Sequence, residues 1–91
     1  MTDAVLSRET TIVNQRGLHA RAAAKFVRTA ATFVARVEVT RDDQTVAGTS
    51  ILGLMLLGAG IGTMLTLRAE GDDAVAALAV LGDLIERGFD E

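Results

Sequence analysis

A chain of 91 residues has room for one small domain with one core, which we expect to span residues 1–91. Apolar residues make up 49% of the chain but aromatic residues only 3%, so the core must be built from aliphatic side chains. The chain has no cysteine, which excludes disulfides, cysteine-ligated zinc and thiol catalysis. A net charge of −3 together with few aromatic residues argues against general nucleic-acid binding.

The charges are distributed unevenly along the chain. Residues 10–37 carry five basic side chains and no acid, whereas residues 70–91 carry seven acids and one arginine. The basic segment therefore favours an acidic or phosphorylated partner. Residues 1–11 lack the basic and apolar regions of a signal peptide, and the uncharged segment 44–67 is interrupted by five glycines. We accordingly expect a cytoplasmic protein without a membrane span.

The first half of the chain predicts a strand, a helix and a hairpin, in that order. Residues 7–13 are rich in threonine and branched side chains, as in a strand, and residues 20–32 have the periodicity of a helix. Residues 33–40 alternate like a half-buried strand, and a turn joins them to a short strand at 45–48. The predicted helix has an apolar face and an opposite basic face: Ala23, Phe26, Val27 and Ala30 against Arg21, Lys25 and Arg28.

The second half of the chain predicts a short helix, a strand and a longer helix. Ser50 fits the N-cap of a helix at 51–58, and the alternating glycines of the segment 58–62 predict a loop. A strand at 63–69 follows. The last helix, at 74–87, has Ala74, Leu78, Leu81 and Ile85 on one face and ends at Gly88. The order β-α-β-β-α-β-α predicts a two-layer α+β sandwich with a largely antiparallel sheet.

His19 is the only histidine of the chain, and it lies at the predicted start of the first helix. A helix N-terminus offers free backbone N–H groups and a partial positive charge, which together bind anions. Arg21 can add a charge-assisted contact to a phosphoryl group, and Lys25 and Arg28 extend the positive face. We expect the ring to be neutral in this position, which is its nucleophilic form. His19 is therefore the candidate acceptor of a phosphoryl group.

No other group forms a catalytic or ligand-binding set with this histidine in the sequence. The glycine segment is not a G-x-G-x-x-G motif, and Ala59 stands where a phosphate-binding loop requires lysine. A single histidine without a carboxylate nearby in the sequence predicts no metal site, and we expect no cofactor. Neither a Ser-His-Asp set nor a carboxylate pair is apparent. We therefore expect a carrier that acts between enzymes rather than an enzyme.

The segment GLHARAAA, residues 17–24, closely resembles the active-site signature of HPr, the histidine phosphocarrier family of the bacterial phosphoenolpyruvate-dependent phosphotransferase system (PTS). TSILGLMLLG, residues 49–58, resembles the serine-helix segment of the same family. Length and element order fit over nearly the whole chain. The resemblance implies an open-faced β-sandwich, in which three helices cover one face of a four-stranded antiparallel sheet. It also implies a role in sugar uptake or in PTS-linked regulation.

The resemblance also implies roles for individual residues. His19 would accept phosphate at Nδ1 from enzyme I, which is charged by phosphoenolpyruvate, and would pass it to a histidine of a IIA-type protein. Arg21 matches the active-site arginine of the family, and Ser50 matches a serine that HPr kinase phosphorylates in some bacteria. The chain departs from the family at Ala22, where proline is frequent, and at Thr49, where a basic residue is frequent.

A docking surface for these partners is implied as well. The segment 51–57 is apolar on nearly all sides, so a short helix cannot bury every side chain against one layer, and some must face outward. The alternative is that its apolar side chains fill the core. The predicted docking residues lie on two helices: Leu52 and Met55 on the second, and Ala20, Ala24, Lys25 and Arg28 on the first.

Two other functions remain open from the sequence. An HPr-like regulator would act through phosphorylation of Ser50 and protein binding, although the presence of His19 argues against it. A small-molecule-binding α+β domain would use the glycine segment 58–62 as its ligand loop. A phosphocarrier with several partners is expected to be a monomer.

Overall fold

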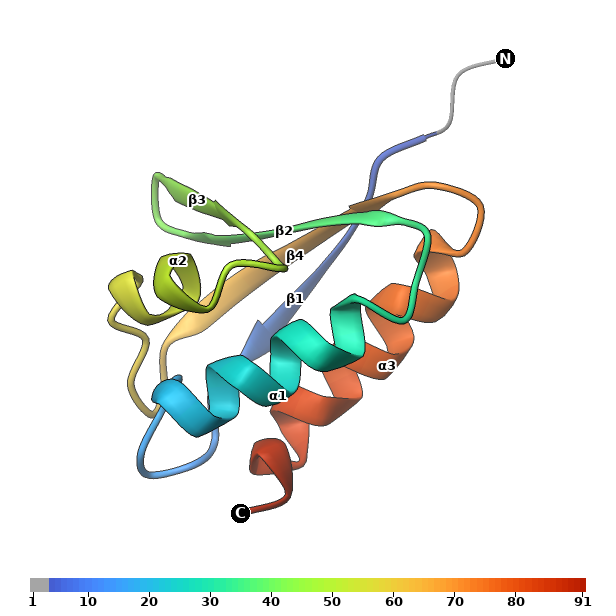
Figure 1. Cartoon of the computed structure of the whole chain (residues 1–91). Coiled ribbons are helices and arrows are strands. Elements are labelled where there is room, and N and C mark those ends of the chain that lie inside the picture. Colours follow the sequence, from blue (N-terminus) through green and yellow to red (C-terminus); the bar gives the residue numbers. More distant parts are fainter. Residues whose placement is uncertain (1–3) are drawn as a thin grey trace.

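The computed structural model describes residues 4–91 and contains four strands and three helices in the predicted order (Figure 1). Residues 1–3 lie outside the described residues. They belong to the expected domain and to the segment 1–11, for which no signal peptide was predicted. The strands are β1 (Leu6–Thr11), β2 (Arg36–Arg41), β3 (Gln44–Ala47) and β4 (Met64–Glu70). The helices are α1 (Ala20–Ala30), α2 (Ile51–Leu56) and α3 (Ala74–Glu86), followed by a short 3-10 turn, η1 (Gly88–Asp90).

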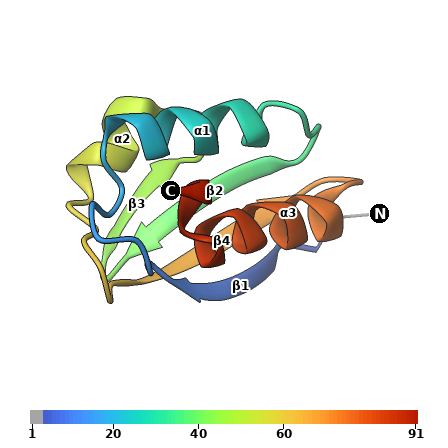
Figure 2. The same cartoon turned by 90° about the horizontal axis from the view of Figure 1, so that it is seen from below.

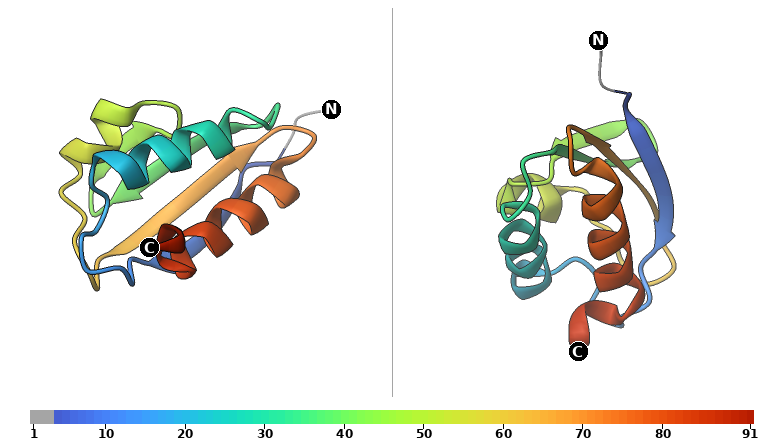
Figure 3. Two further views of the ribbon diagram at one scale, coloured as in Figure 1. Left: turned by 60° about the horizontal axis from the view of Figure 1, so that its bottom comes forward. Right: turned by 90° about the vertical axis from the view of Figure 1, so that its right-hand side faces the viewer.

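All strand pairs of the sheet are antiparallel, in the order β1-β4-β2-β3. Leu6 of β1 lies opposite Ala69 of β4, and Val39 of β2 lies opposite Leu67 of β4 and Val46 of β3. The three helices cover one face of this sheet and leave the other face open (Figures 2 and 3). The predicted open-faced α+β sandwich is confirmed.

The core lies between the sheet and the helices. Along β4, buried side chains alternate with more exposed ones, because successive residues of a strand point to opposite faces. Each large apolar side chain that the core removes from water stabilises the fold by about 1.5–3 kcal/mol. Val27 of the predicted face of α1 is only partly buried against the core. The other predicted residues of the two long helices and of β4 are buried: Ala23, Phe26, Ala30, Leu65, Leu67, Ala74, Leu78, Leu81 and Ile85.

The connection from α1 to β2 differs from its prediction. The helix predicted to run to residue 32 ends at Ala30, and the strand predicted to start at residue 33 begins at Arg36. The backbone N–H groups of Val34 and Ala35 donate to the carboxylate of Asp73, at 2.9 and 2.7 Å, instead of joining a strand. This carboxylate thereby ties the connection to the start of α3.

Side chains cap both ends of α2. Ser50 is the N-cap, as predicted, because its Oγ accepts a hydrogen bond from the Gly53 N–H at 2.9 Å. At the other end, Nη1 of Arg41 donates to the carbonyl oxygens of Leu57 and Gly58, at 2.8 and 2.7 Å. The guanidinium thus supplies hydrogen-bond donors to carbonyls that backbone N–H groups would bind in a longer helix. The helix ends at Leu56, before the predicted residue 58.

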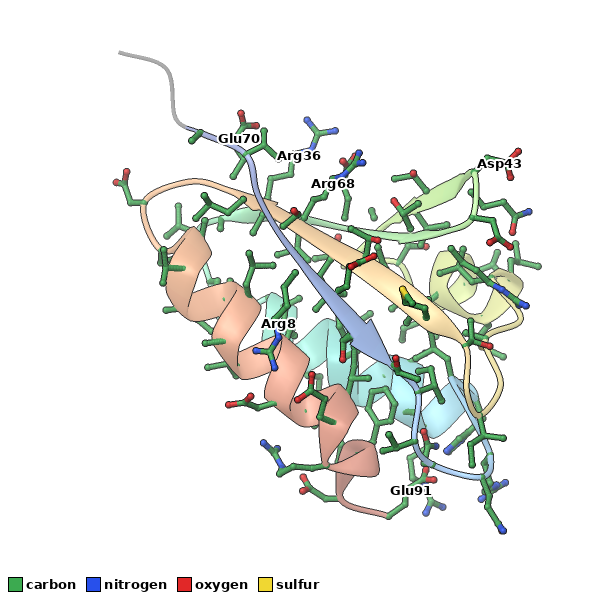
Figure 4. The ribbon with its side chains drawn as sticks, turned by 180° about the vertical axis from the view of Figure 1, so that it is seen from behind. Arg8, Arg36, Asp43, Arg68, Glu70 and Glu91 are labelled. Atoms are coloured by element: carbon green, nitrogen blue, oxygen red, sulfur yellow. The ribbon has the colours of Figure 1, made fainter. Side chains whose placement is uncertain are left out.

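Arg8 fastens β1 to α3, and Figure 4 shows its side chain reaching from the strand to the helix. Its guanidinium donates to two backbone carbonyls of α3, both at 3.3 Å, and pairs with Asp83 and Glu86 at 3.3 and 3.0 Å. It lies directly over Gly82, where a Cβ would come within 2.3 Å of Cζ of the arginine. Only the absence of a side chain at this position lets the guanidinium approach the helix so closely.

Candidate functional site

His19 lies at the start of α1, as predicted. It occupies the N-cap position, but its ring does not cap the helix. Its backbone carbonyl accepts the Ala23 N–H at 2.8 Å. Among the described residues, no acceptor meets the backbone N–H groups of Ala20, Arg21 and Ala22. Because these donors lie at the positive end of the helix dipole, the start of α1 can stabilise an anion beside the histidine.

The loop that precedes His19 packs against the glycine segment 58–62. Gly17 has a φ of +65°, and a Cβ on it would lie 2.5 Å from the carbonyl oxygen of Ala59. The same oxygen accepts the Leu18 N–H at 2.9 Å. Glycine alone combines this backbone conformation with so close an approach. The glycine segment is a loop between α2 and β4, as predicted, and it supports the histidine loop.

The carboxylate of Glu91 holds the His19 ring by Nε2. The histidine side chain is only 17% exposed, and its Nε2 contacts Oε2 of Glu91. The other carboxylate oxygen, Oε1, accepts a hydrogen bond from Nδ2 of Asn14 at 3.0 Å. These hydrogen bonds from His19 and Asn14 lower the pKa of Glu91, because they stabilise its ionised form. The ring therefore contacts a carboxylate, whereas the sequence led us to expect positive groups beside it.

The turn after α3 brings Glu91 to this site. Gly88, with a φ of +69°, ends α3 as predicted, but the chain continues through η1. Phe89 is 1% exposed, and its carbonyl accepts a hydrogen bond from Nζ of Lys25 at 2.8 Å. The chain therefore returns to the end of the molecule at which α1 begins (Figures 1 and 4). This contribution was not predicted, and the apolar Phe89 just beyond the helix-ending glycine was the available signal for it.

The predicted positive side chains lie on the outer side of α1. Arg21 and Arg28 are exposed, and Lys25 is half-buried against η1. A small cavity of about 110 Å³ lies between the helix and η1, with Arg21, Lys25 and Glu91 in its lining. The structure thus brings Arg21 and Lys25 to the same cavity as Glu91, whereas Arg28 is not part of this lining.

An apolar surface is exposed on α2, and we call it the α2 surface. Leu52 is 67% exposed and Met55 42% exposed, while Leu54 is fully buried. The alternative that Leu52 and Met55 belong to the core is therefore wrong. α2 lies beside α1, on which the predicted docking residue Ala20 is exposed and Ala24 is half-buried. The α2 surface also contains two residues that the sequence analysis did not single out, and its members are Ile51, Leu52, Met55 and Leu56.

The uncharged segment 44–67 forms no membrane span. It is divided among β3, α2, a loop and most of β4. Over residues 4–91, none of the helices has both the length and the apolar character needed to cross a bilayer. The same residues include no group of three or more His, Asp or Glu side chains that could hold a metal ion.

Comparison with known proteins relates this site to one family. Residues 6–87 match the family described as PTS HPr component phosphorylation site. The phosphocarrier protein HPr of Cupriavidus necator is 45% identical over 87 residues, which cover 96% of this chain and 98% of the relative. That of Pseudomonas aeruginosa is 49% identical over 84 residues, with coverages of 91% and 93%. The crystal structure of HPr-C-His from Thermoanaerobacter tengcongensis has a TM-score of 0.90 at 44% identity, covering 94% of this chain and 97% of that one. The chain therefore belongs to the HPr family of phosphocarrier proteins of the phosphotransferase system.

Proposed function

We propose that this chain carries a phosphoryl group on His19, which enzyme I donates and a IIA-type protein accepts. The observation that carries the proposal is the position of the only histidine at the N-cap of α1, beside backbone N–H groups without acceptors among the described residues. A phosphoryl group bound there is negatively charged, so these N–H groups and the nearby guanidinium of Arg21 stabilise it. Membership of the HPr family supports the same assignment.

The proposed transfer needs no cofactor of its own. The unprotonated Nδ1 of His19 attacks the phosphorus of a phosphohistidine on enzyme I, and the donor N–P bond breaks. The electron pair of that bond returns to the donor imidazole. The phosphorylated chain then serves as donor in the same kind of step toward a histidine of the IIA-type protein. In this reading the chain is a cytoplasmic carrier between phosphotransferases and not an enzyme.

We propose that both partners dock on the α2 surface and on the adjoining start of α1. An exposed apolar patch of this kind marks an interface in a small protein. The basic side chains beside it favour an acidic partner, because opposite charges attract during encounter. The α1 residues of this proposed interface are Ala20, Ala24, Lys25 and Arg28.

Incubation with phosphoenolpyruvate and enzyme I tests the proposal. We expect one acid-labile phosphate on the wild-type chain and none on His19→Ala, with both proteins folded by circular dichroism. Arg21→Glu should slow the transfer and leave the fold intact. Discharge by IIA-type proteins of sugar uptake or of regulation then identifies the branch. A wild-type chain that stays unlabelled where the Cupriavidus necator HPr is labelled contradicts the proposal.

Regulation through Ser50 by an HPr kinase/phosphorylase is the second candidate. Ser50 is partly exposed at the start of α2, next to the α2 surface. The helix dipole favours a negatively charged phosphate at this N-cap, and the charge of that phosphate repels an acidic partner. Under this candidate, Ser50→Asp lowers the rate at which enzyme I phosphorylates His19, whereas Ser50→Ala does not. Equal rates for the two variants would remove Ser50 from the regulation.

A further inference from the structure

We infer that Asn14 and Glu91 are positioning residues, which hold the His19 ring by Nε2 and leave Nδ1 as the reactive nitrogen. The inference deepens the proposed function, on which it rests, because it concerns which nitrogen receives the phosphoryl group. Neither residue belongs to the motif that the sequence analysis singled out.

The carboxylate of Glu91 is held on two sides. One oxygen contacts Nε2 of His19, and the other accepts from Nδ2 of Asn14 at 3.0 Å. The Asn14 amide is itself fixed, since its residue is 7% exposed and its Nδ2 also donates to the carbonyl of Gly17 at 2.9 Å. Its Oδ1 has no hydrogen-bond partner in the described structure. Reversing this amide would therefore break both bonds, so the observed orientation is the one that directs N–H groups at the carboxylate.

The turn that carries Glu91 is anchored to α1. Phe89 is buried in the core, and its carbonyl is held by Nζ of Lys25 at 2.8 Å. Arg87 pairs with Asp90 at 2.9 Å across the same turn. The Glu91 N–H also donates to the Gly88 carbonyl at 3.1 Å, so the ring is met by a residue of a folded turn.

The contact with Nε2 has a chemical consequence for Nδ1. An ionised carboxylate only accepts hydrogen bonds, so the proton that it binds must reside on Nε2. A neutral imidazole carries a single N–H, and its Nδ1 therefore keeps a free lone pair. When the Nδ1–P bond forms, the donor N–P bond breaks and its electrons return to the donor ring, so no proton has to leave His19. The ring then becomes positively charged, and the ionised Glu91 stabilises that charge.

Proton NMR of the unphosphorylated chain tests this inference directly. We expect the wild type to show a His19 Nε2–H proton that exchanges slowly with water. Glu91→Ala and Asn14→Ala should lose this protected proton, and their phosphorylation by enzyme I should slow by about threefold to tenfold, as expected for one lost hydrogen bond. Asp72→Asn is the matched control, because it removes one exposed negative charge before the opposite end of α3 and touches neither the ring nor η1. It should keep both the protected proton and the rate.

The two arms of this experiment separate the possible failures. A protected Nε2–H that persists in Glu91→Ala, or a wild-type ring protonated on Nδ1, overturns the inference whatever the transfer rate. Loss of the proton in Glu91→Ala with an unchanged rate overturns the claim that positioning matters for transfer. A wild type that enzyme I never phosphorylates refutes the proposed function instead, and the NMR result then still decides how the ring is held.

Discussion

Replacing Gly82 with alanine tests the contact by which Arg8 fastens β1 to α3. A Cβ at this position would lie 2.3 Å from Cζ and 2.5 Å from Nε of Arg8, so the guanidinium has to move away. It would then lose four hydrogen bonds to α3, which at its partial exposure contribute about 0.5 kcal/mol each, or about 2 kcal/mol together. Alanine itself favours a helix over glycine by about 1 kcal/mol. We therefore expect a net loss of about 1 kcal/mol in the free energy of unfolding.

The sign of this effect should reverse when the guanidinium is absent. In an Arg8→Ala background the three atoms nearest to the new Cβ are absent, so Gly82→Ala should stabilise the protein by about 1 kcal/mol through helix propensity. Urea unfolding followed by far-ultraviolet circular dichroism measures both steps, because the chain has no tryptophan or tyrosine for fluorescence. Equal effects of Gly82→Ala in the two backgrounds, or stabilisation of the wild type, would refute the reasoning.

Three further predictions concern the site. Gly17→Ala should lower the free energy of unfolding by about 3 kcal/mol, because it places a side chain in the left-handed region and against a backbone carbonyl; a loss below about 0.5 kcal/mol on denaturation would contradict the clash. The double change Leu52→Glu and Met55→Glu should slow transfer from enzyme I by about tenfold and alter stability by less than about 0.5 kcal/mol, because both side chains are exposed; unchanged transfer kinetics would exclude the α2 surface from the interface. The hydrogen bond from His19 is the largest cause that lowers the pKa of Glu91 from its ordinary 4.5. The stabilisation that this hydrogen bond gives the folded protein is complete above that pH and is lost as the pH falls through the lower pKa that Glu91 has in the folded state. The urea midpoint of the wild type should therefore fall more steeply on acidification than that of Glu91→Gln. Parallel curves would show that the carboxylate contributes nothing to stability.

Local patterns in the sequence predicted most of the fold. The periodicity of residues 20–30 and 74–86 identified two helices and their buried faces, because a helix must bury its apolar side against the sheet. The N-cap Ser50 was also predictable, because capping depends on residues that are neighbours in the sequence. The start of β2 was not predictable from the sequence, because it depends on hydrogen bonds to Asp73, which is distant in the sequence.

Only those parts of the candidate site that are contiguous in the sequence were predicted. The histidine loop and the positive face of α1 are contiguous in the sequence, and the excess of apolar residues in the segment 51–57 indicated the exposed side of α2. No local pattern predicts the contact between Glu91 and His19, because it arises from a turn that is anchored to Lys25 of α1. No spacing rule links an imidazole at position 19 to a carboxylate at position 91.

Arg41 makes the α2 surface depend on the β2–β3 hairpin, at the edge of the sheet that α2 contacts. Its guanidinium joins the β2–β3 hairpin to the carbonyls of Leu57 and Gly58 just after α2, and the hairpin turn next to it places Asp42 in a left-handed conformation with a φ of 53°. The exposed side chains of α2 are therefore held in place partly by a hairpin that lies outside the α2 surface. A substitution in the hairpin can accordingly alter the position of the α2 surface without changing any of its side chains.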